Sequence, residues 1–247
     1  LAAAPGSPLR PVPTEWSDGG AGAQPADADA IAAVLATASQ QTPRGRRRSV
    51  AMLVDFGEPA IPHLVAALRD TSRPQAERAV AARALASLSP AQFAAQSIGI
   101  VDAGFDAARQ AMDSAARLDA VTDVSGLAGL LARAQRERAS ASIDFLLELL
   151  ALRGLLPDSD LLIVSLHSSN PKVRANAMEA IETGIGHALF RRVDAVLRPD
   201  ERKSAPPPAD AELDGLLDTA LNQGAPVEIA VALTMLRGLI SEGDFVR

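Results

Sequence analysis

The amino-acid sequence predicts an all-α fold, an array of antiparallel helices joined by short turns. Apolar residues make up 48% of the 247 residues but aromatic residues only 3%, with Trp16 the single tryptophan and no tyrosine. Ala and Leu favour helices, whereas strands favour the β-branched and aromatic types. Apolar positions also recur at i, i+3, i+4 and i+7, the spacing that lines one face of a helix. No segment shows the alternation typical of a half-buried strand.

The first 25 residues are expected to form a disordered lead or linker. Residues 1–25 are rich in Pro, Gly and Ala, so they have too little apolar surface to offset the entropy lost on ordering. A helical repeat domain is expected over residues 26–247. Its apolar stripes are formed by Ile31, Val34, Leu35 and Ala38; Ile61, Leu64, Val65 and Leu68; Ala81, Ala84, Leu85 and Leu88; Ile143, Leu146, Leu147 and Leu150; Leu213, Leu216, Leu217 and Ala220; and Ile229, Leu233, Leu236 and Ile240.

The breaks between the first stripes contain Gly, Pro and capping residue types. Gly57 is expected to end one helix, and Pro59 to stand where the next begins, because the missing N–H of proline costs nothing in the first turn. The segments DTSRP (70–74) and PDSD (157–160) combine Pro with residues that cap helices. Each is therefore predicted to be a turn.

Two later breaks are equally explicit. In SSNP (168–171), Asn170 is predicted to be the N-cap and Pro171 the first helical residue. The charged and Pro-rich segment RPDERKSAPPPADAE (198–212) predicts an exposed loop. Helices of roughly 10–20 residues between such breaks would pack as antiparallel neighbours.

Residues 56–88, FGEPAIPHLVAALRDTSRPQAERAVAARALASL, resemble a HEAT repeat. Repeats of this kind are paired helices that stack into a solenoid. Pro62, Asp70 and Arg78 follow the order of the HEAT pattern, and an Ala-rich helix follows the arginine. The interval from the aspartate to the arginine is about two residues longer than in the pattern. The resemblance implies an α-solenoid of stacked antiparallel helix pairs, in which these three residues have structural roles.

A second window, LLIVSLHSSNPKVRANAMEAIETGI (161–185), also resembles a HEAT repeat. Asn170 and Pro171 begin its second helix, and Arg174 occupies the arginine position of the pattern. We expect Arg174 to be structural and to reach toward neighbouring turns. The aspartate that precedes it in the pattern is replaced by serine, so an Asp–Arg pair is not expected there. Residues 91–135 match neither window.

Residues 136–185 have a narrower resemblance. RERASASIDFLLELLALRG (136–154) and the segment after it are similar to the HEAT segment of bacterial proteins fused to a nucleotide-translocase-like or major-facilitator membrane domain. This resemblance implies a cytoplasmic, non-enzymatic interaction or regulatory domain, placed at the cytosolic face of a membrane as part of a larger transporter-like protein. The first residue is Leu1 rather than Met, which agrees with that expectation.

Two alternatives remain open. Instead of a part of a transporter-like protein, the chain would be a free-standing scaffold that holds a protein partner in the groove of its solenoid, or a HEAT-like enzyme that processes nucleic acid. The enzyme is the weaker alternative, because few aromatic side chains are present to stack a displaced base.

The residue inventory excludes several kinds of chemistry. The absence of Cys excludes disulfides, thiolate zinc sites and cysteine nucleophiles. His63, His167 and His187 lie in separate segments without metal-ligand spacing, and no phosphate-loop, nucleophile-elbow or kinase motif is present. We therefore expect no enzyme activity, no catalytic, metal-binding or cofactor-binding residue, and no cofactor.

Charge and hydropathy bear on the partners. The formal net charge of -6 and the pI near 5.1 make nucleic acid an unlikely partner. The most apolar segment, IDFLLELLALRGLL (143–156), is interrupted by Asp144, Glu148 and Arg153, so no transmembrane segment is expected within this chain. The expected partner is a protein or an adjoining domain.

Two arginine clusters are the candidate interaction residues. RGRRR (44–48) contains Arg46, Arg47 and Arg48, and the second cluster contains Arg133, Arg136 and Arg138, of which Arg133 and Arg136 are the candidates. Arginines at the start of a helix oppose the helix dipole, so the first cluster is expected to meet an acidic partner, phosphate or the headgroups of a membrane surface. A solvated helix face is the structural alternative for both clusters.

Overall fold

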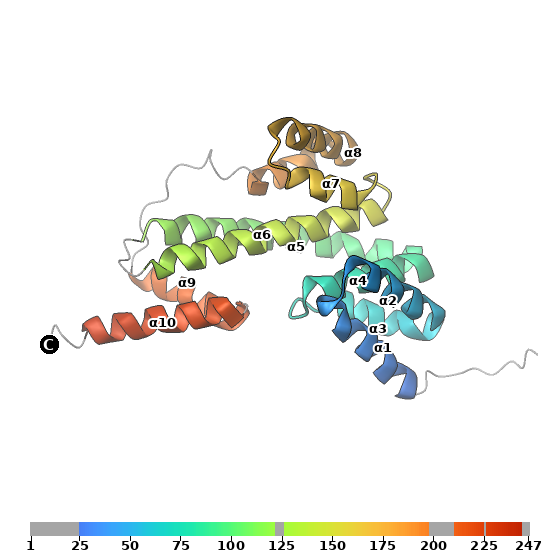
Figure 1. The fold of residues 1–247 in the computed structure, drawn as a ribbon, viewed down its shortest axis with the longest axis horizontal. Helices are drawn as coiled ribbons and strands as arrows, with labels where there is room; N and C mark the ends of the chain where they lie inside the picture. Colours follow the sequence, from blue (N-terminus) through green and yellow to red (C-terminus); the bar gives the residue numbers. More distant parts are fainter. Residues whose placement is uncertain (1–24, 122–125, 198–209, 225, 244–247) are drawn as a thin grey trace, which may run out of the picture.

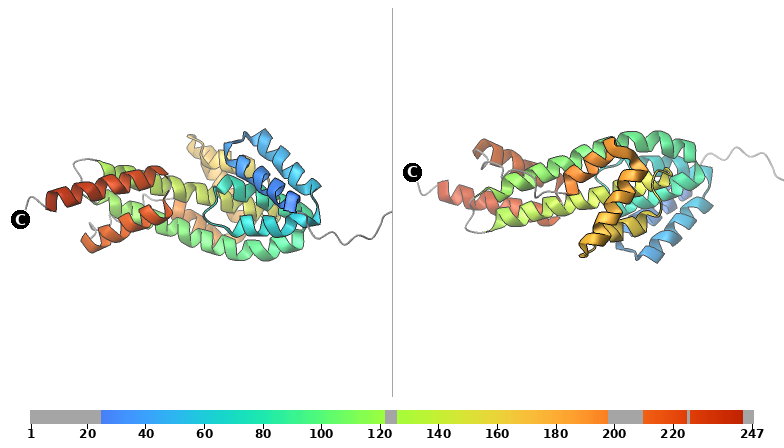
Figure 2. Two further views of the ribbon diagram at one scale, coloured as in Figure 1. Left: turned by 90° about the horizontal axis from the view of Figure 1, so that it is seen from below. Right: turned by 90° about the horizontal axis from the view of Figure 1, so that it is seen from above.

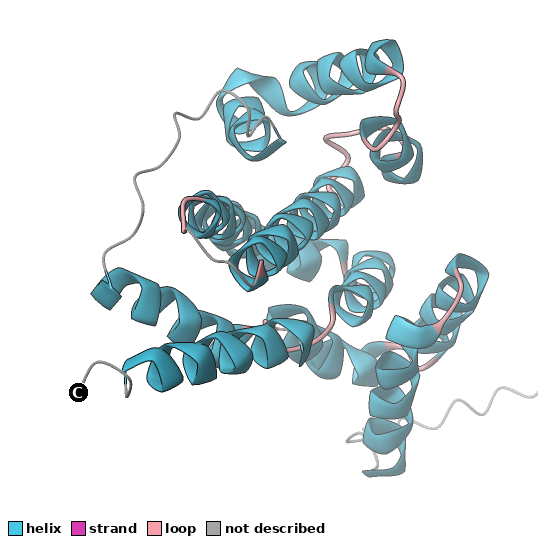
Figure 3. Ribbon diagram, turned by 60° about the vertical axis from the view of Figure 1, so that its left-hand side comes forward, coloured by secondary structure: helices cyan, strands magenta, loops and turns pink. Residues whose placement is uncertain are grey.

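The computed structural model describes residues 25–121, 126–197, 210–224 and 226–243, and every regular element within them is helical (Figure 3). This confirms the predicted all-α class. The elements, with η marking a 3-10 helix, are α1 (Pro25–Thr37), η1 (Ala38–Gln40), α2 (Pro43–Asp55), η2 (Glu58–Ala60), α3 (Ile61–Arg69), α4 (Gln75–Leu88), α5 (Pro90–Asp119), α6 (Leu127–Leu152), α7 (Ser159–Leu166), α8 (Pro171–Leu197), α9 (Asp210–Gln223) and α10 (Pro226–Gly243).

Two of the predicted irregular segments fall largely outside the described residues. Of the lead predicted at 1–25, only Pro25 is described, and it is the first residue of α1. Of the loop predicted at 198–212, residues 198–209 are not described. The end of that loop was predicted wrongly, because α9 begins at Asp210. Ala and Glu directly after this Asp are good helix formers, which accounts for the earlier start.

The two long helices α5 and α6 form a hairpin that runs along the molecule (Figure 1). They contain 30 and 26 residues, which is longer than the helices that the sequence predicts. After Pro90, no cluster of turn residues appears until TDVSG at 122–126, so nothing interrupts the first helix. The second helix begins after Gly126, whose φ of 71° marks the end of the connection.

The other helices pack at different places on this hairpin. Helices α1–α4 gather at one end of it, and α9 and α10 lie at the other (Figures 1 and 2). Helices α7 and α8 pack against each other and against α6, on a third side. The hairpin therefore joins two separate clusters of buried residues, which we call the main core and the tip core.

The main core lies between helices α1–α8 and confirms much of the predicted apolar patterning. It contains Leu85, whose side chain is completely buried. Its largest fully buried side chains are Ile31, Leu35, Leu53, Leu64, Leu68, Leu85, Ile143, Leu146, Leu147 and Leu149. Large aliphatic side chains that leave water together are the main source of stability in such a core.

The tip core joins α9 and α10 to the far end of the hairpin. Its buried members among the described side chains are Ala115, Leu118, Ala128, Leu131, Ala132, Leu217, Ala220, Ala232 and Met235. The stripe predicted for α10 is partly wrong, because Leu233 is 54% exposed while Ala232 and Met235 are buried. The side chain of Glu228 is buried against α6, on the same inward face of α10 as Ala232 and Met235. The side chain of Ile240, also predicted in this stripe, lies outside the described residues.

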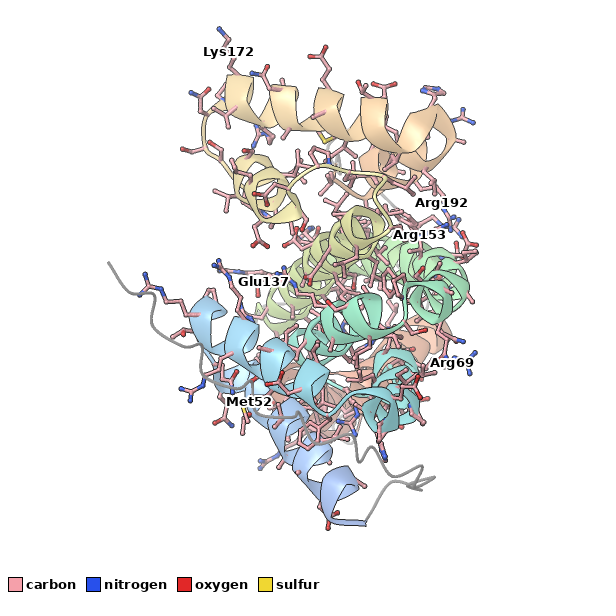
Figure 4. All side chains as sticks on the ribbon, turned by 90° about the vertical axis from the view of Figure 1, so that its right-hand side faces the viewer. Met52, Arg69, Glu137, Arg153, Lys172 and Arg192 are labelled. Atoms are coloured by element: carbon pink, nitrogen blue, oxygen red, sulfur yellow. The ribbon has the colours of Figure 1, made fainter. Side chains whose placement is uncertain are left out.

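Two glycines permit sharp changes of chain direction. Gly57 has φ of 70° between α2 and η2, so the predicted helix end is present there. Gly186 has φ of 76° and ψ of 160°, which kinks α8. Both values are left-handed conformations that favour glycine. After the kink, Arg192 Nη1 donates to Asp102 Oδ1 of α5 at 2.6 Å, and Figure 4 shows this arginine between the two helices.

Candidate interaction surface

Helix α2 carries the first predicted arginine cluster, and its start is well defined. The Oγ1 of Thr42 accepts a hydrogen bond from the Gly45 amide at 3.3 Å, and Pro43 is the first helical residue. The first turn contains no acidic residue. The usual favourable charge at a helix N-terminus is therefore missing from α2.

One arginine of the cluster holds the turn before α2. Arg46 Nη1 donates to the backbone oxygen of Gln41 at 3.1 Å, and Ser49 Oγ donates to Gln41 Oε1 at 2.8 Å. A Cβ at Gly45 would lie 3.0 Å from the Cβ of Gln41, so the glycine lets the helix approach this turn closely. Arg46, a predicted interaction residue, is thus already engaged within the chain.

The remaining arginines form what we call the arginine face: Arg44, Arg47 and Arg48. All three are exposed, and within the described part of the chain none of them makes an ion pair or a side-chain hydrogen bond. Their spacing of i, i+3 and i+4 places them on one side of the helix. Met52, 44% exposed, continues this side one turn later, and Figure 4 shows it on the outer surface of the N-terminal helices.

The arginine face is electrostatically unfavourable as it stands. Arg44 is a helical neighbour of both Arg47 and Arg48, and like charges at these spacings destabilise a helix by roughly 0.2–0.5 kcal/mol per pair. The positive end of the helix dipole adds to the repulsion. An anionic group bound on this face would offset both effects, and guanidinium groups are suited to bidentate contacts with carboxylate or phosphate.

The second predicted cluster differs, because its arginines are ion-paired. Arg133 Nε lies 2.9 Å from Glu137 Oε1 on the same helix, with both side chains mostly exposed. Arg136 pairs with Asp119 at the end of α5. Arg136 therefore links the two helices of the hairpin, Arg133 pairs within α6, and neither is an unpaired cation.

The third arginine of the second cluster links α6 to α10. Arg138 pairs with Glu228 of α10, whose side chain is only 3% exposed, and Gln135 Nε2 donates to the same carboxylate at 3.3 Å. The two partners stand 90 residues apart in sequence, so no local spacing could have revealed the pair. The contact fastens α10 to α6.

The HEAT-pattern residues of the first window meet at the turn between α3 and α4. Arg78 Nε donates to the Leu68 oxygen at 3.1 Å, which satisfies a carbonyl at the end of α3, and the guanidinium lies 4.7 Å from the Phe145 ring centroid. Burial lowers the pKa of Arg78, and the charge of Asp70 partly offsets this. Pro62 lies in the first turn of α3 and is exposed.

Asp70 closes the turn that the sequence predicts at 70–74. Its Oδ1 accepts hydrogen bonds from the Ser72 amide at 3.0 Å and from the Ser72 hydroxyl at 2.5 Å. These bonds, together with the charge of Arg73, hold the pKa of the Asp70 carboxyl below its ordinary value. Arg73 Nε lies 3.3 Å from Asp70 Oδ2. The turn is therefore stabilised from within.

In the second window, the predicted cap is present but the arginine contact is not. Asn170 Oδ1 accepts from the Lys172 amide at 2.9 Å, and Pro171 begins α8. Arg174 is exposed, and no ion pair or side-chain hydrogen bond of Arg174 occurs within the described residues. The expectation that Arg174 reaches neighbouring turns is thus wrong for this structure, because residues 171–176 at the start of α8 are all exposed.

Two further polar groups tie helices together. Arg83 of α4 bridges Glu148 of α6, at 2.5 Å, and Asp160 of α7, at 3.0 Å. Burial alone would lower the pKa of Arg83, but its bonds to these carboxylates raise it. His167 Nε2 lies 2.9 Å from Asp144 Oδ2. Arg83 thus links α4 to α6 and α7, and His167 links the end of α7 to α6.

The described residues offer little that would support catalysis. Among them there is no group of three or more His, Cys, Asp or Glu side chains placed to hold a metal ion. A groove of about 360 Å³ between α6 and α10 is lined mainly by apolar side chains such as Leu127, Val227 and Val231. A smaller one, about 140 Å³, lies between α1 and α3 beside His63 and Asp70. Neither brings a nucleophile and a base together.

Among the described helices, none is by itself long and apolar enough to cross a membrane. One pair, Pro43–Asp55 with Glu58–Arg69, meets the length and composition required of a span only when its halves are joined, and they are bent by 112°. Both halves contribute completely buried residues to the main core, including Leu53 and Leu64.

Comparison with known proteins found no match to this chain among protein-family models, curated proteins or solved structures. The resemblance to HEAT repeats therefore stays a prediction from the residues quoted above.

Proposed function

We propose that this chain is a non-enzymatic interaction module that binds an acidic protein partner through the arginine face. The observation that carries the proposal is the contrast among the arginines. Most of those on the central hairpin are ion-paired within the chain, including Arg117, Arg133 and Arg136, whereas Arg44, Arg47 and Arg48 are exposed without a partner in the described residues.

A protein surface fits this face better than a free anion does. Met52 is exposed beside the arginines, so the surface offers apolar contact next to positive charge. Interfaces are enriched in Arg and Met. The cationic residues stand on the exposed side of one helix, where carboxylates of a partner helix at i and i+4 spacing would meet them. Such charge complementarity also speeds association.

The order of the helix pairs supports the further proposal of a HEAT-like α-solenoid. The pairs α3–α4, α5–α6 and α7–α8 follow one another in sequence, and each packs against the next. An array of this kind presents exposed helices to partners without any active site. The arginine face lies beside the first of these pairs, because α2 packs on α4.

The test measures binding of a labelled acidic helix. The probe is a fluorescein-labelled peptide with Glu at successive i, i+4 positions, and its anisotropy is followed as protein is added at low salt. Changing Arg44, Arg47 and Arg48 together to Glu should weaken binding at least about tenfold, because three favourable contacts become repulsive. Unchanged affinity would reject the proposal.

A matched control separates the arginine face from net charge. Arg69, Arg174 and Arg191 are also exposed and lie outside α2, so changing all three to Glu alters the net charge by the same amount. This variant should bind the peptide with nearly wild-type affinity. Vesicles containing anionic lipid form a second arm, and binding to vesicles but not to peptide would identify a membrane surface as the partner instead.

The resemblance at 136–185 motivates a broader proposal, that the module is one part of a larger membrane-associated protein. An antibody raised against the 25.6 kDa chain would be used on membrane and soluble fractions of the native cells. A much larger band in salt-washed membranes supports the proposal. A band near the mass of the chain in the soluble fraction supports the free-standing scaffold.

A further inference from the structure

A second charged face lies at the opposite end of the molecule from the arginine face. Helix α9 contains the four acidic residues Asp210, Glu212, Asp214 and Asp218 and no basic residue. Figures 1 and 2 show α9 and α2 at opposite ends of the long α5–α6 hairpin. The charge of the folded chain is therefore distributed unevenly along its length.

Two of these carboxylates are free to meet a partner. Glu212 already pairs with Arg117 of α5. Asp214 and Asp218 are exposed, and within the described residues neither makes an ion pair. They stand at i and i+4, so both point from the same side of the helix.

The acidic pair matches the arginine face in spacing. Arg44 and Arg48 are also separated by four residues, so two helices lying side by side would bring both opposite-charge pairs into contact at once. The apolar part of the face fits as well. Gly215 is exposed next to the two carboxylates and has open space where a Cβ would be, which leaves room for the exposed side chain of Met52.

We propose that copies of this chain associate head to tail, with the arginine face of one copy on Asp214 and Asp218 of the next. The inference rests on the proposed function, since it assigns the acidic protein surface to a second copy. The two faces cannot meet within one molecule, because the hairpin holds them at opposite ends. Each added copy leaves one face of each kind unoccupied, so the association extends beyond a dimer unless it closes into a ring.

The contacts are exposed ion pairs, which are weak singly and are screened by salt. The association is therefore concentration-dependent at low ionic strength and is lost at high ionic strength. Sedimentation velocity of the full chain over a range of concentrations should show a rising mass average in dilute buffer. In about 0.5 M NaCl the same samples should sediment as monomers.

Two neutral variants test the faces separately. The first changes Arg44, Arg47 and Arg48 to Gln, and the second changes Asp214 and Asp218 to Asn. Each variant alone should remain monomeric at low salt. The mixture should form a one-to-one dimer and nothing larger, because the only intact pair of faces is the acidic face of the first variant with the arginine face of the second. Circular dichroism melts confirm that both variants fold.

The outcomes separate this inference from the proposed function. A wild-type chain that stays monomeric at low salt, or oligomers that persist in either variant, would overturn head-to-tail association. In either case, the proposed function still stands if the acidic peptide binds the Asp-to-Asn variant and not the Arg-to-Gln variant. A wild-type chain that binds no acidic peptide and also stays monomeric at low salt would overturn both.

Discussion

The two ends of the α5–α6 hairpin are stabilised in different ways. The main core brings together large aliphatic and aromatic side chains from helices α1–α8. In the tip core, five of the nine buried residues that the structure describes are alanines. Burial of an alanine removes much less apolar surface from water than burial of a leucine or phenylalanine does. The tip core therefore contributes less hydrophobic stabilisation for each residue that it buries.

Specific polar contacts replace part of the missing apolar area at the tip. Glu228 is buried between α10 and α6 with Arg138 and Gln135 as its partners, and Arg117 pairs with Glu212 of α9. A buried charge is strongly destabilising once its partner is removed. The main core therefore depends mostly on packing, with polar links such as that of Arg83 added to it, whereas the attachment of α9 and α10 depends more on a few polar residues.

The largest effect is expected from Leu85→Asp in the main core. An unpaired charge at this completely buried position should lower the free energy of unfolding by about 4 kcal/mol or more. Circular dichroism would show lost helicity or a much lower melting temperature. Ile98→Asp on α5 is the control, since Ile98 is 51% exposed, and it should melt close to wild type. Wild-type melting of the Leu85 variant would show that this core is misassigned.

At the tip, Arg138→Ala should have a smaller and local effect. It leaves Glu228 buried without its cation, and because Arg138 is itself 30% exposed, we expect a loss of about 2 kcal/mol. Hydrogen exchange should become faster in α9 and α10, with the protection of α3 and α4 unchanged. Arg133→Ala removes an exposed pair from the same helix and should change little. Equal loss of protection at both ends would argue against two separately stabilised regions.

A pair of glycines on α5 tests how closely the two long helices pack in the main core. A Cβ at Gly104 would lie 2.6 Å from Leu146 Cδ2 of α6, whereas a Cβ at Gly99 would have no neighbour within 4 Å. Gly104→Ala should destabilise the chain by about 1 kcal/mol through overpacking. Gly99→Ala should stabilise it by up to about 1 kcal/mol through helix propensity. Urea denaturation of both variants measures the difference, and two changes of the same sign would contradict the close approach.

The smallest expected effect is on how the stability of the helices around the main core depends on pH. Burial raises the pKa of Asp144 above its ordinary value of 3.8, and His167 partly opposes this. The folded state then binds the proton more tightly than the unfolded state, so the stability due to Asp144 is present in acid and is lost as pH rises through the folded pKa. Asp144→Asn should therefore gain stability relative to wild type between about pH 4 and neutral pH. Parallel pH curves in urea denaturation would exclude this effect.

Local chemistry in the sequence was a sound guide to helix ends and to the main core. Asn170, Gly57 and the turn at 70–74 act as predicted, because capping and left-handed turns depend on residues a few positions apart. The lengths of α5 and α6 were missed, since their sequence lacks the turn residues that would have divided them into shorter helices. The inward face of α10 was missed because it buries a charged residue, Glu228, whose partners Gln135 and Arg138 lie on α6, far away in sequence.

The same limit applies to the candidate site. The arginine cluster is visible in the sequence, but its division into Arg46 and the arginine face depends on the conformation of the turn at Gln41. The ion pairs of Arg83 and Arg138 join positions 65 to 90 residues apart. Only the packing of whole helices brings these charges together, and periodicity within one helix carries no information about it.

The continuous α5 helix sets the distance between the two cores. At about 1.5 Å per residue its 30 residues span about 45 Å, and each residue also turns the helix by about 100°. Length and rotation are therefore coupled. Adding one residue to each helix of the hairpin between the two cores would rotate the attachment site of α9 and α10 by a little more than a quarter turn about the helix axis. Adding seven residues to each helix would move this attachment site outward by about two helical turns and leave the direction in which it faces almost unchanged.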